Sequence, residues 1–148
     1  MRAAVDASDS HLRPWIPWMK DEPRSMDETA ARIAHQIGEF DAGVTFCWAV
    51  FHDGTFVGEV MLMTRAGPGA LEVGYWLHAD HAGRGYGRES VSRLVALADE
   101  LGIERLEAWC ALGNLRSSAL VQGLGFERER IEADGAHDYG VWVRRGES

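Results

Sequence analysis

The 148-residue chain contains little cysteine and no long apolar run. Its two cysteines, Cys47 and Cys110, form no C-x-x-C pair and have no matching histidine cluster, so no disulfide framework or zinc site is indicated. We interpret both as buried, reduced thiols, which indicates a cytoplasmic protein. No apolar run approaches membrane-spanning length and the first residues have no signal-peptide core, so we expect no membrane segment.

Positive charge is also scarce. The chain has 15 Lys and Arg residues and 23 Asp and Glu residues, which gives a formal net charge of -8. Nucleic-acid binding needs a basic face, so we do not expect nucleic acid as a partner. The chain has 46% hydrophobic and 26% charged residues, which are globular values. Without repeats or linkers, residues 1–148 are expected to form one domain.

The N-terminal third of the chain predicts one regular helix after an irregular segment. Pro14, Pro17 and Pro23 exclude a regular helix interior in the stretch "HLRPWIPWMKDEP". Ser25 and Glu28 then form an S-x-x-E capping box, which predicts a helix start. The apolar positions that recur at helical spacing are Ala30, Ile33, Ala34, Ile37 and Phe40.

The rest of the chain predicts a mixed α/β sheet. β-branched and aromatic runs predict strands at residues 45–51, 56–64, 71–77 and 105–111, and "GFERERIE" and "HDYGVWVRR" predict two more. Asp53-Gly54 indicates a hairpin between the first two. Helices are expected at residues 86–101 and from Asn114 to about Gly123. Strands 71–77 and 105–111 flank a helix at βαβ spacing, so they should be parallel.

The stretch "YWLHADHAGRGYGRES" contains the clearest functional signal, a glycine-rich turn before a helix. Gly83, Gly85 and Gly87 can adopt unusual dihedral angles and let a phosphate approach the backbone, while Arg84 and Arg88 add positive charge. The spacing is not the dinucleotide G-x-G-x-x-G, and there is no G-K-[ST] of a nucleotide-triphosphate loop. The alternative is a turn that only changes the direction of the chain.

Three segments together resemble one enzyme family. "LEVGYWLHADHAGRGYGRES" is similar to the acetyl-CoA signature of the GNAT N-acetyltransferases, in their ribosomal-protein N-terminal acetyltransferase branch. "NLRSSALVQGLGFERE" is similar to a second family motif, and "HLRPWIPW" also recurs in that branch. The resemblance implies the GNAT fold, a mostly antiparallel sheet with a splayed parallel pair and flanking helices.

The resemblance also implies where acetyl-CoA, the cosubstrate, would bind. Its pyrophosphate would lie on the turn from Gly83 to Arg88, which includes Tyr86, and its pantetheine arm would pair with the strand end at Trp76, Leu77 and His78. Asn114 matches an asparagine that reaches the donor, although it could instead only cap its helix.

An amine acceptor would attack the thioester directly, and the resemblance assigns two catalytic residues. Glu72 is the predicted base, because glutamate is common at that position in this branch, and Glu59 is a weaker rival. Strand alternation places Glu72, Gly74 and Trp76 on one face and Val73 and Tyr75 on the other. Ser117 matches a serine near the sulfur that could donate a hydrogen bond to the departing thiolate.

Two departures from the family pattern stand out. Ala82 occupies a position where the family often has Gln or Arg, so its side chain contributes nothing. Family members usually begin with a strand, whereas this chain begins inside the first helix, so either the start of the sequence was assigned late or the sheet lacks one edge strand. The family also includes homodimers, but the sequence identifies no interface.

Other interpretations stay open. Trp15 and Trp18 could form a wall of the acceptor pocket or only pack their loop onto the sheet. The His78–Asp80–His81 run offers too few ligands for a metal site, so we expect no metal. A non-catalytic acyl-CoA-binding module would keep the glycine turn and Asn114 without needing Glu72 or Ser117. The acceptor could be a protein N-terminal α-amine or a small-molecule amine.

Overall fold

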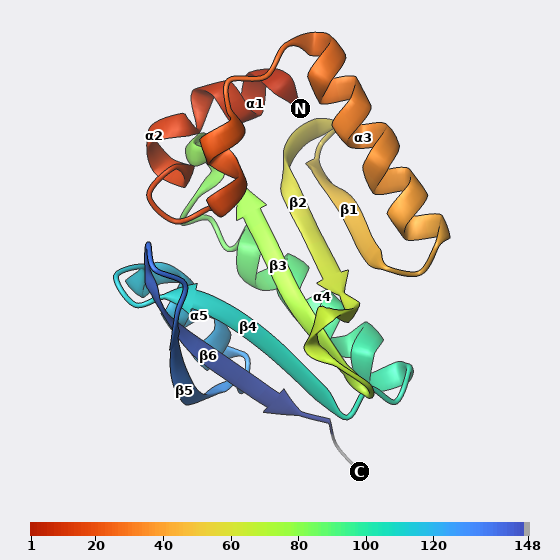
Figure 1. Cartoon of the computed structure of the whole chain (residues 1–148), viewed down its shortest axis with the longest axis vertical. Helices are drawn as coiled ribbons and strands as arrows, with labels where there is room; N and C mark the ends of the chain where they lie inside the picture. The colour runs from red at the N-terminus through yellow and green to blue at the C-terminus, as the bar shows by residue number, and fades with distance from the viewer. Residues whose placement is uncertain (147–148) are drawn as a thin grey trace.

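The computed structural model describes residues 1–146, in which six strands form one sheet in the order β1-β2-β3-β4-β6-β5 (Figure 1). The strands are β1 (Thr45–His52), β2 (Thr55–Met63), β3 (Ala70–Leu77), β4 (Arg105–Ala111), β5 (Glu127–Ala133) and β6 (Asp138–Arg145). All neighbouring strands are antiparallel except β3 and β4, which are parallel. The predicted hairpin, βαβ unit and mixed α/β sheet are therefore confirmed.

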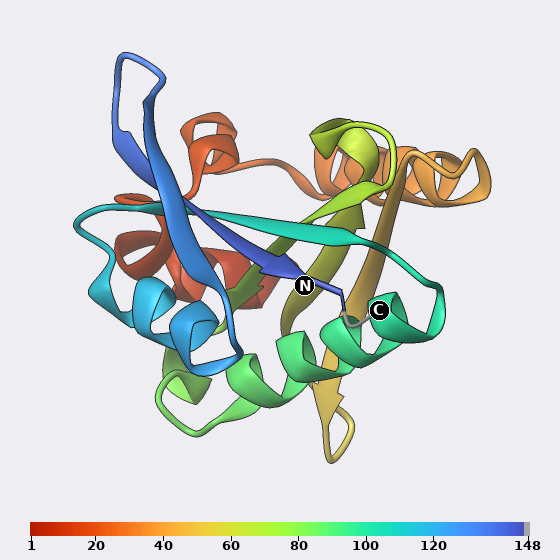
Figure 2. The same ribbon diagram turned by 90° about the horizontal axis from the view of Figure 1, so that it is seen from below.

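Helices cover both faces of this sheet, and Figure 2 shows α3 and α4 on opposite sides of it. The helices are α1 (Arg2–Ala7), α2 (Asp9–Leu12), α3 (Met26–Asp41), α4 (Tyr86–Glu100) and α5 (Leu115–Gly123), with short 3-10 turns η1 (Pro17–Asp21), η2 (Thr64–Ala66) and η3 (Ala79–His81). The main core lies under α4 and α5, where Val91, Val121 and Phe126 pack against β-strand residues such as Leu62 and Val73. A second cluster joins α1, α2 and η1 to Trp76 on the other face.

Helix α3 has the predicted capping box, but its apolar positions do not form a buried face. Ser25 Oγ accepts from the Glu28 backbone N–H, and the Glu28 side chain accepts from the Ser25 N–H. The apolar positions from Ala30 to Phe40 are nevertheless exposed. The sheet under α3 carries the buried carboxylate of Glu59, to which Gln36 and Arg32 donate at 2.9 and 3.4 Å. A buried carboxylate needs donors, so the polar side of the helix faces the sheet.

The two cysteines are free, but only Cys110 is fully buried. Cys47 is half-buried, which corrects the expectation, and its Sγ donates to Glu59 Oε2 at 2.9 Å. Burial, and then the charge of Glu59, raise the pKa of the Cys47 thiol. Cys47 is therefore a protonated hydrogen-bond donor under α3.

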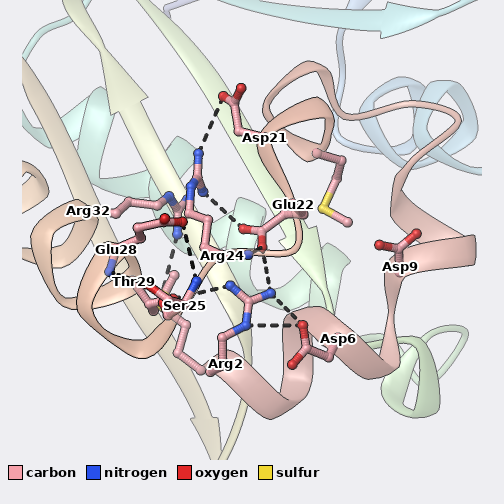
Figure 3. Close-up of polar contacts among 12 residues, drawn as sticks. Arg2, Asp6, Asp9, Asp21, Glu22, Arg24, Ser25, Glu28, Thr29 and Arg32 are labelled. Atoms are coloured by element: carbon pink, nitrogen blue, oxygen red, sulfur yellow. Dashed lines mark hydrogen bonds and ion pairs between the residues drawn. The ribbon is translucent and has the colours of Figure 1, made fainter.

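A buried ion cluster ties α1 to the segment before α3 (Figure 3). The Glu22 side chain is only 2% exposed, and Arg2 Nη2 lies 2.6 Å from its Oε2. Arg24 donates to the same carboxylate from its side chain at 3.0 Å and from its backbone N–H at 2.9 Å. The cluster therefore anchors the loop that carries the tryptophans described below.

Replacing Glu22 with glutamine is expected to lower the free energy of unfolding by about 1–3 kcal/mol at pH 7, because it leaves buried donors poorly satisfied. Burial acts to raise the pKa of Glu22, but the hydrogen bonds from Arg2 and Arg24 and their charges lower it overall. A carboxylate with a lowered folded-state pKa stabilises the protein above its unfolded pKa of about 4.3 and loses that effect as pH falls through the folded-state pKa. Urea unfolding of both proteins between pH 3 and 7 measures this, and a difference that does not shrink below about pH 4 would contradict it.

Candidate active site

A cleft opens where the two parallel strands separate. β3 and β4 pair only from Ala70–Val73 to Arg105–Ala108, whereas β3 continues to pair with β2 up to Leu77, and β4 with β6 up to Ala111. Figure 1 shows β3 and β4 diverging toward their carboxyl ends. A cavity of about 1320 Å³ lies at this point and is lined by residues of both faces of the sheet.

The open edge of β3 presents backbone groups to this cleft. The His78 N–H donates to the Val57 carbonyl at 2.7 Å, so the backbone of His78 and of alternate residues such as Trp76 points toward β2. Backbone groups alternate along a strand, so those of Tyr75 and Leu77 point toward β4 and the gap. Of the three residues expected to meet the pantetheine arm, Leu77 has its backbone N–H in the required direction.

The glycine turn joins the cleft to the start of α4. Gly83 and Gly85 have φ angles of 76° and 84°, as expected for a turn that needs left-handed residues. Gly85 is the N-cap of α4 and, in the described chain, no side chain caps that helix start, so its first N–H groups are available to an anion. Gly87 lies inside α4 and serves packing, because an added Cβ would lie 2.9 Å from Leu77 Cδ1.

Nine of the twelve predicted site residues line the cleft, and three do not. Those that line it are Glu72, Trp76, Leu77, Gly83, Gly85, Gly87, Arg88, Asn114 and Ser117. Arg84 is exposed on the turn, outside the cleft wall. Tyr86 packs against the His52 ring at 4.8 Å, and His78 Nδ1 accepts from the Asp80 backbone N–H at 3.0 Å. In residues 1–146 no cluster of three metal-ligating side chains is found.

Asn114 and Ser117 lie together at the start of α5. Asn114 Oδ1 accepts from the Ser117 backbone N–H at 3.3 Å, so Asn114 caps the helix while its residue also lines the cleft. Ser117 Oγ lies 2.6 Å from Tyr75 Oη and 3.4 Å from Cys110 Sγ. Burial raises the pKa of Tyr75 and of Cys110, which keeps both groups protonated.

Two buried carboxylates face the cleft from neighbouring strands. Glu72 and Glu107 are opposite each other in the β3–β4 register, one residue before the paired segment ends, and each is 6% exposed. Arg65 binds Glu72 through two hydrogen bonds of 2.5 and 2.6 Å, whereas Glu107 accepts from Arg105 Nε and Trp109 Nε1 at 3.3 Å. Arg65 is 68% exposed, so the ion pair is open to solvent on its outer side.

Strand alternation in the sequence predicted the face on which Glu72 lies, but it was not used to identify Glu107. Val73 packs in the main core, which confirms that Glu72 lies on the opposite face of β3. Glu59, the rival base, is buried under α3 and does not line the cleft, because it binds Gln36 and Cys47. Glu107 was missed, and the alternation within "RLEAWCA" was the signal that could have indicated it.

Aromatic side chains form the walls beside these carboxylates. Trp15 and Trp18 both line the cleft, so their loop borders the pocket as one interpretation expected. Trp18 also packs edge-on against Trp76 at 5.9 Å and lies under the Arg32 guanidinium at 4.6 Å, so the packing interpretation holds as well. Trp109 and Tyr139, which sequence reasoning did not single out, line the cleft from β4 and β6.

A parallel pair of strands that separates over a glycine turn is the arrangement that the family resemblance implied. The family description "Acetyltransferase (GNAT) domain" matches residues 2–127. The chain therefore belongs to the GNAT acetyltransferase family and is an N-acetyltransferase. A search of curated proteins found no match.

Solved structures share the fold at low sequence identity. RimL, a ribosomal L7/L12 alpha-N-protein acetyltransferase in complex with coenzyme A, has a TM-score of 0.87 at 21% identity, over 98% of this chain and 86% of that chain. The microcin C7 self-immunity acetyltransferase MccE, in complex with acetyl-CoA and AMP, has a TM-score of 0.88 at 15% identity, over 97% and 84%. Mycobacterium smegmatis RimJ has a TM-score of 0.83 at 21% identity, over 97% and 75%.

The helices of residues 1–146 are all too short or too polar to cross a membrane.

Proposed function

We propose that this enzyme acetylates the α-amine at the N-terminus of a peptide or protein. The observation that carries the proposal is the Glu72–Glu107 pair, which places two buried carboxylates beside the point where β3 and β4 separate. Carboxylate oxygens in the cleft can accept hydrogen bonds from an amine, and the aromatic walls offer apolar surface to the residues that follow it. RimL, whose fold this chain shares, is an α-N-protein acetyltransferase.

The chemistry of the acceptor also favours an α-amine. An amine must be neutral to attack a thioester, and at pH 7 this costs about 1–1.4 kcal/mol for an α-amine but about 4.6 kcal/mol for a lysine. A carboxylate that acts directly or through one water can meet the smaller demand. Glu72 is the proposed base, with Arg65 holding its carboxylate in place.

On the donor side, the proposal uses groups that the fold leaves open. The pyrophosphate would lie on the first N–H groups of α4 with Arg88 beside it, because a helix start and a guanidinium both stabilise phosphate charge. The Leu77 N–H points into the gap, where it could hold the thioester oxygen as negative charge develops. The acceptor nitrogen forms a bond to the acetyl carbon, the carbon–sulfur bond breaks, the electron pair leaves with sulfur, and the amine proton passes to Glu72.

The acceptor is tested with one peptide that carries a free α-amine and an internal lysine, incubated with acetyl-CoA at pH 7. We expect the acetyl group at the α-amine, located by fragmentation mass spectrometry. The same peptide with a blocked N-terminus is the matched control and should give no product. A polyamine that reacts tenfold faster than the peptide with the free α-amine would instead indicate a small-molecule acceptor.

A further inference from the structure

Three side chains form a hydrogen-bonded chain on the α5 side of the cleft. Tyr75 on β3, Ser117 on α5 and Cys110 on β4 all line the cavity, although they come from three different elements. Tyr75 Oη lies 2.6 Å from Ser117 Oγ, and Ser117 Oγ lies 3.4 Å from Cys110 Sγ. The Tyr75–Ser117 contact is therefore short, and it joins the open edge of β3 to the helix start.

The direction of this chain follows from the number of protons. Tyr75 has one hydroxyl proton, and it can donate to Ser117 Oγ at 2.6 Å or to the Ser117 carbonyl at 3.4 Å. The shorter contact is the stronger one, and a phenol is a better donor than an aliphatic hydroxyl. When Tyr75 donates to Ser117 Oγ, the Ser117 proton is directed to an acceptor other than Tyr75, which in this structure is Cys110 Sγ.

We infer that Tyr75 is a positioning residue that orients the Ser117 hydroxyl toward the sulfur of the departing coenzyme A. This rests on the proposed function and on the role that the family resemblance implies for Ser117, a hydrogen bond to the leaving thiolate. As the carbon–sulfur bond breaks, the electron pair moves onto sulfur and the Ser117 O–H stabilises it. Tyr75 acts only through Ser117 and keeps its own proton throughout.

A role for Tyr75 as the acid itself does not fit its surroundings. Burial is the main reason that the pKa of Tyr75 is raised, with the neighbouring Cys110 adding to it and the hydrogen bond between Tyr75 and Ser117 opposing it. A phenolate in this position would be costly, so proton loss from Tyr75 is disfavoured. An oriented hydroxyl, by contrast, needs no ionised intermediate on the protein.

A double-mutant cycle with Tyr75→Phe, Ser117→Ala and the double variant tests this inference. We expect Tyr75→Phe to lower kcat roughly 5- to 10-fold, as for one lost neutral hydrogen bond, with acetyl-CoA affinity unchanged within about twofold. In the Ser117→Ala background the same change should cost nothing further, because the group that Tyr75 orients is gone. Equal losses in both backgrounds would overturn the inference and indicate that Tyr75 supports the fold.

A second variant covers the case in which Tyr75→Phe does not fold. A trifluorotyrosine at position 75 keeps the shape of the ring but ionises at lower pH, and an ionised phenol can only accept a hydrogen bond. The ionised phenol would then accept a hydrogen bond from the Ser117 hydroxyl and turn its proton away from sulfur. The kcat of this variant should therefore fall as pH rises through the ionisation, whereas the kcat of the native enzyme should not fall over the same pH range. The Ser117→Ala enzyme with the same substitution should show no such step, and a step there would contradict the inference.

The single variants distinguish the role of Ser117 from the role of Tyr75. Full activity in Ser117→Ala would overturn the role of Ser117 and the inference with it. A large loss in Ser117→Ala with no loss in Tyr75→Phe would overturn only the inference about Tyr75.

Discussion

Replacing Glu72 with glutamine is expected to lower kcat for acetyl transfer about 100- to 10,000-fold, the usual contribution of a positioned general base. The amide keeps the size of the side chain but cannot take the amine proton. Acetyl-CoA affinity should change little, because Glu72 lies on the acceptor face of β3, opposite the core-facing Val73. Steady-state rates with a peptide acceptor, together with calorimetric titration of acetyl-CoA, separate the two effects.

Glu107→Gln is the matched control for that experiment, because Glu107 is equally buried and lies opposite Glu72 in the strand register. We expect a loss of no more than about tenfold, comparable to weakening one or two hydrogen bonds. A loss in Glu107→Gln that exceeds the loss in Glu72→Gln would move the base to β4. The longer contacts of Glu107, at 3.3 Å, make that outcome chemically reasonable.

Replacing Arg88 with alanine is expected to weaken acetyl-CoA binding roughly 10- to 100-fold, as for one lost hydrogen bond to a charged group. Arg88 lines the cleft in the first turn of α4, next to the N–H groups that Gly85 leaves uncapped. The hydrogen bond from Arg88 Nη2 to the Gly123 carbonyl is long, at 3.5 Å, so little holds this side chain away from a phosphate. Calorimetric titration with acetyl-CoA at two salt concentrations measures the change.

Arg84→Ala provides the comparison, because Arg84 is four residues away on the same turn but outside the cleft wall. We expect a smaller effect that is lost at higher salt, since exposed charges are screened over about 8 Å at physiological ionic strength. If Arg84→Ala weakens binding as much as Arg88→Ala does, the phosphates lie on the outer side of the turn. If neither variant weakens it, the glycine turn does not hold the donor.

The sequence predicted those features of the site that depend on neighbours along the chain. Gly85 precedes a helix and Asn114 caps one, and both arrangements follow from residues three or four positions apart. The Glu72–Glu107 pair depends on the register of two strands 35 positions apart, which no local pattern specifies. The Tyr75–Ser117 contact depends in the same way on how α5 packs against β3.

Helix α3 shows a different limit. Its apolar spacing predicted the helix correctly, but the pattern carries no information about what lies on the sheet beneath it. The buried carboxylate of Glu59 requires donors, and Arg32 and Gln36 supply them from the polar side of the helix. His78 is similar, since its motif position could not show that its backbone N–H donates to the Val57 carbonyl.

The short parallel pairing of β3 and β4 has a mechanical consequence. The sheet consists of two three-stranded units, β1–β3 and β4–β6, joined along a seam of only four residue pairs. A small change in the tilt of one three-stranded unit relative to the other would alter the width of the gap between the ends of β3 and β4. Substitutions at seam residues such as Leu71 and Leu106 are therefore expected to change the width of the cleft.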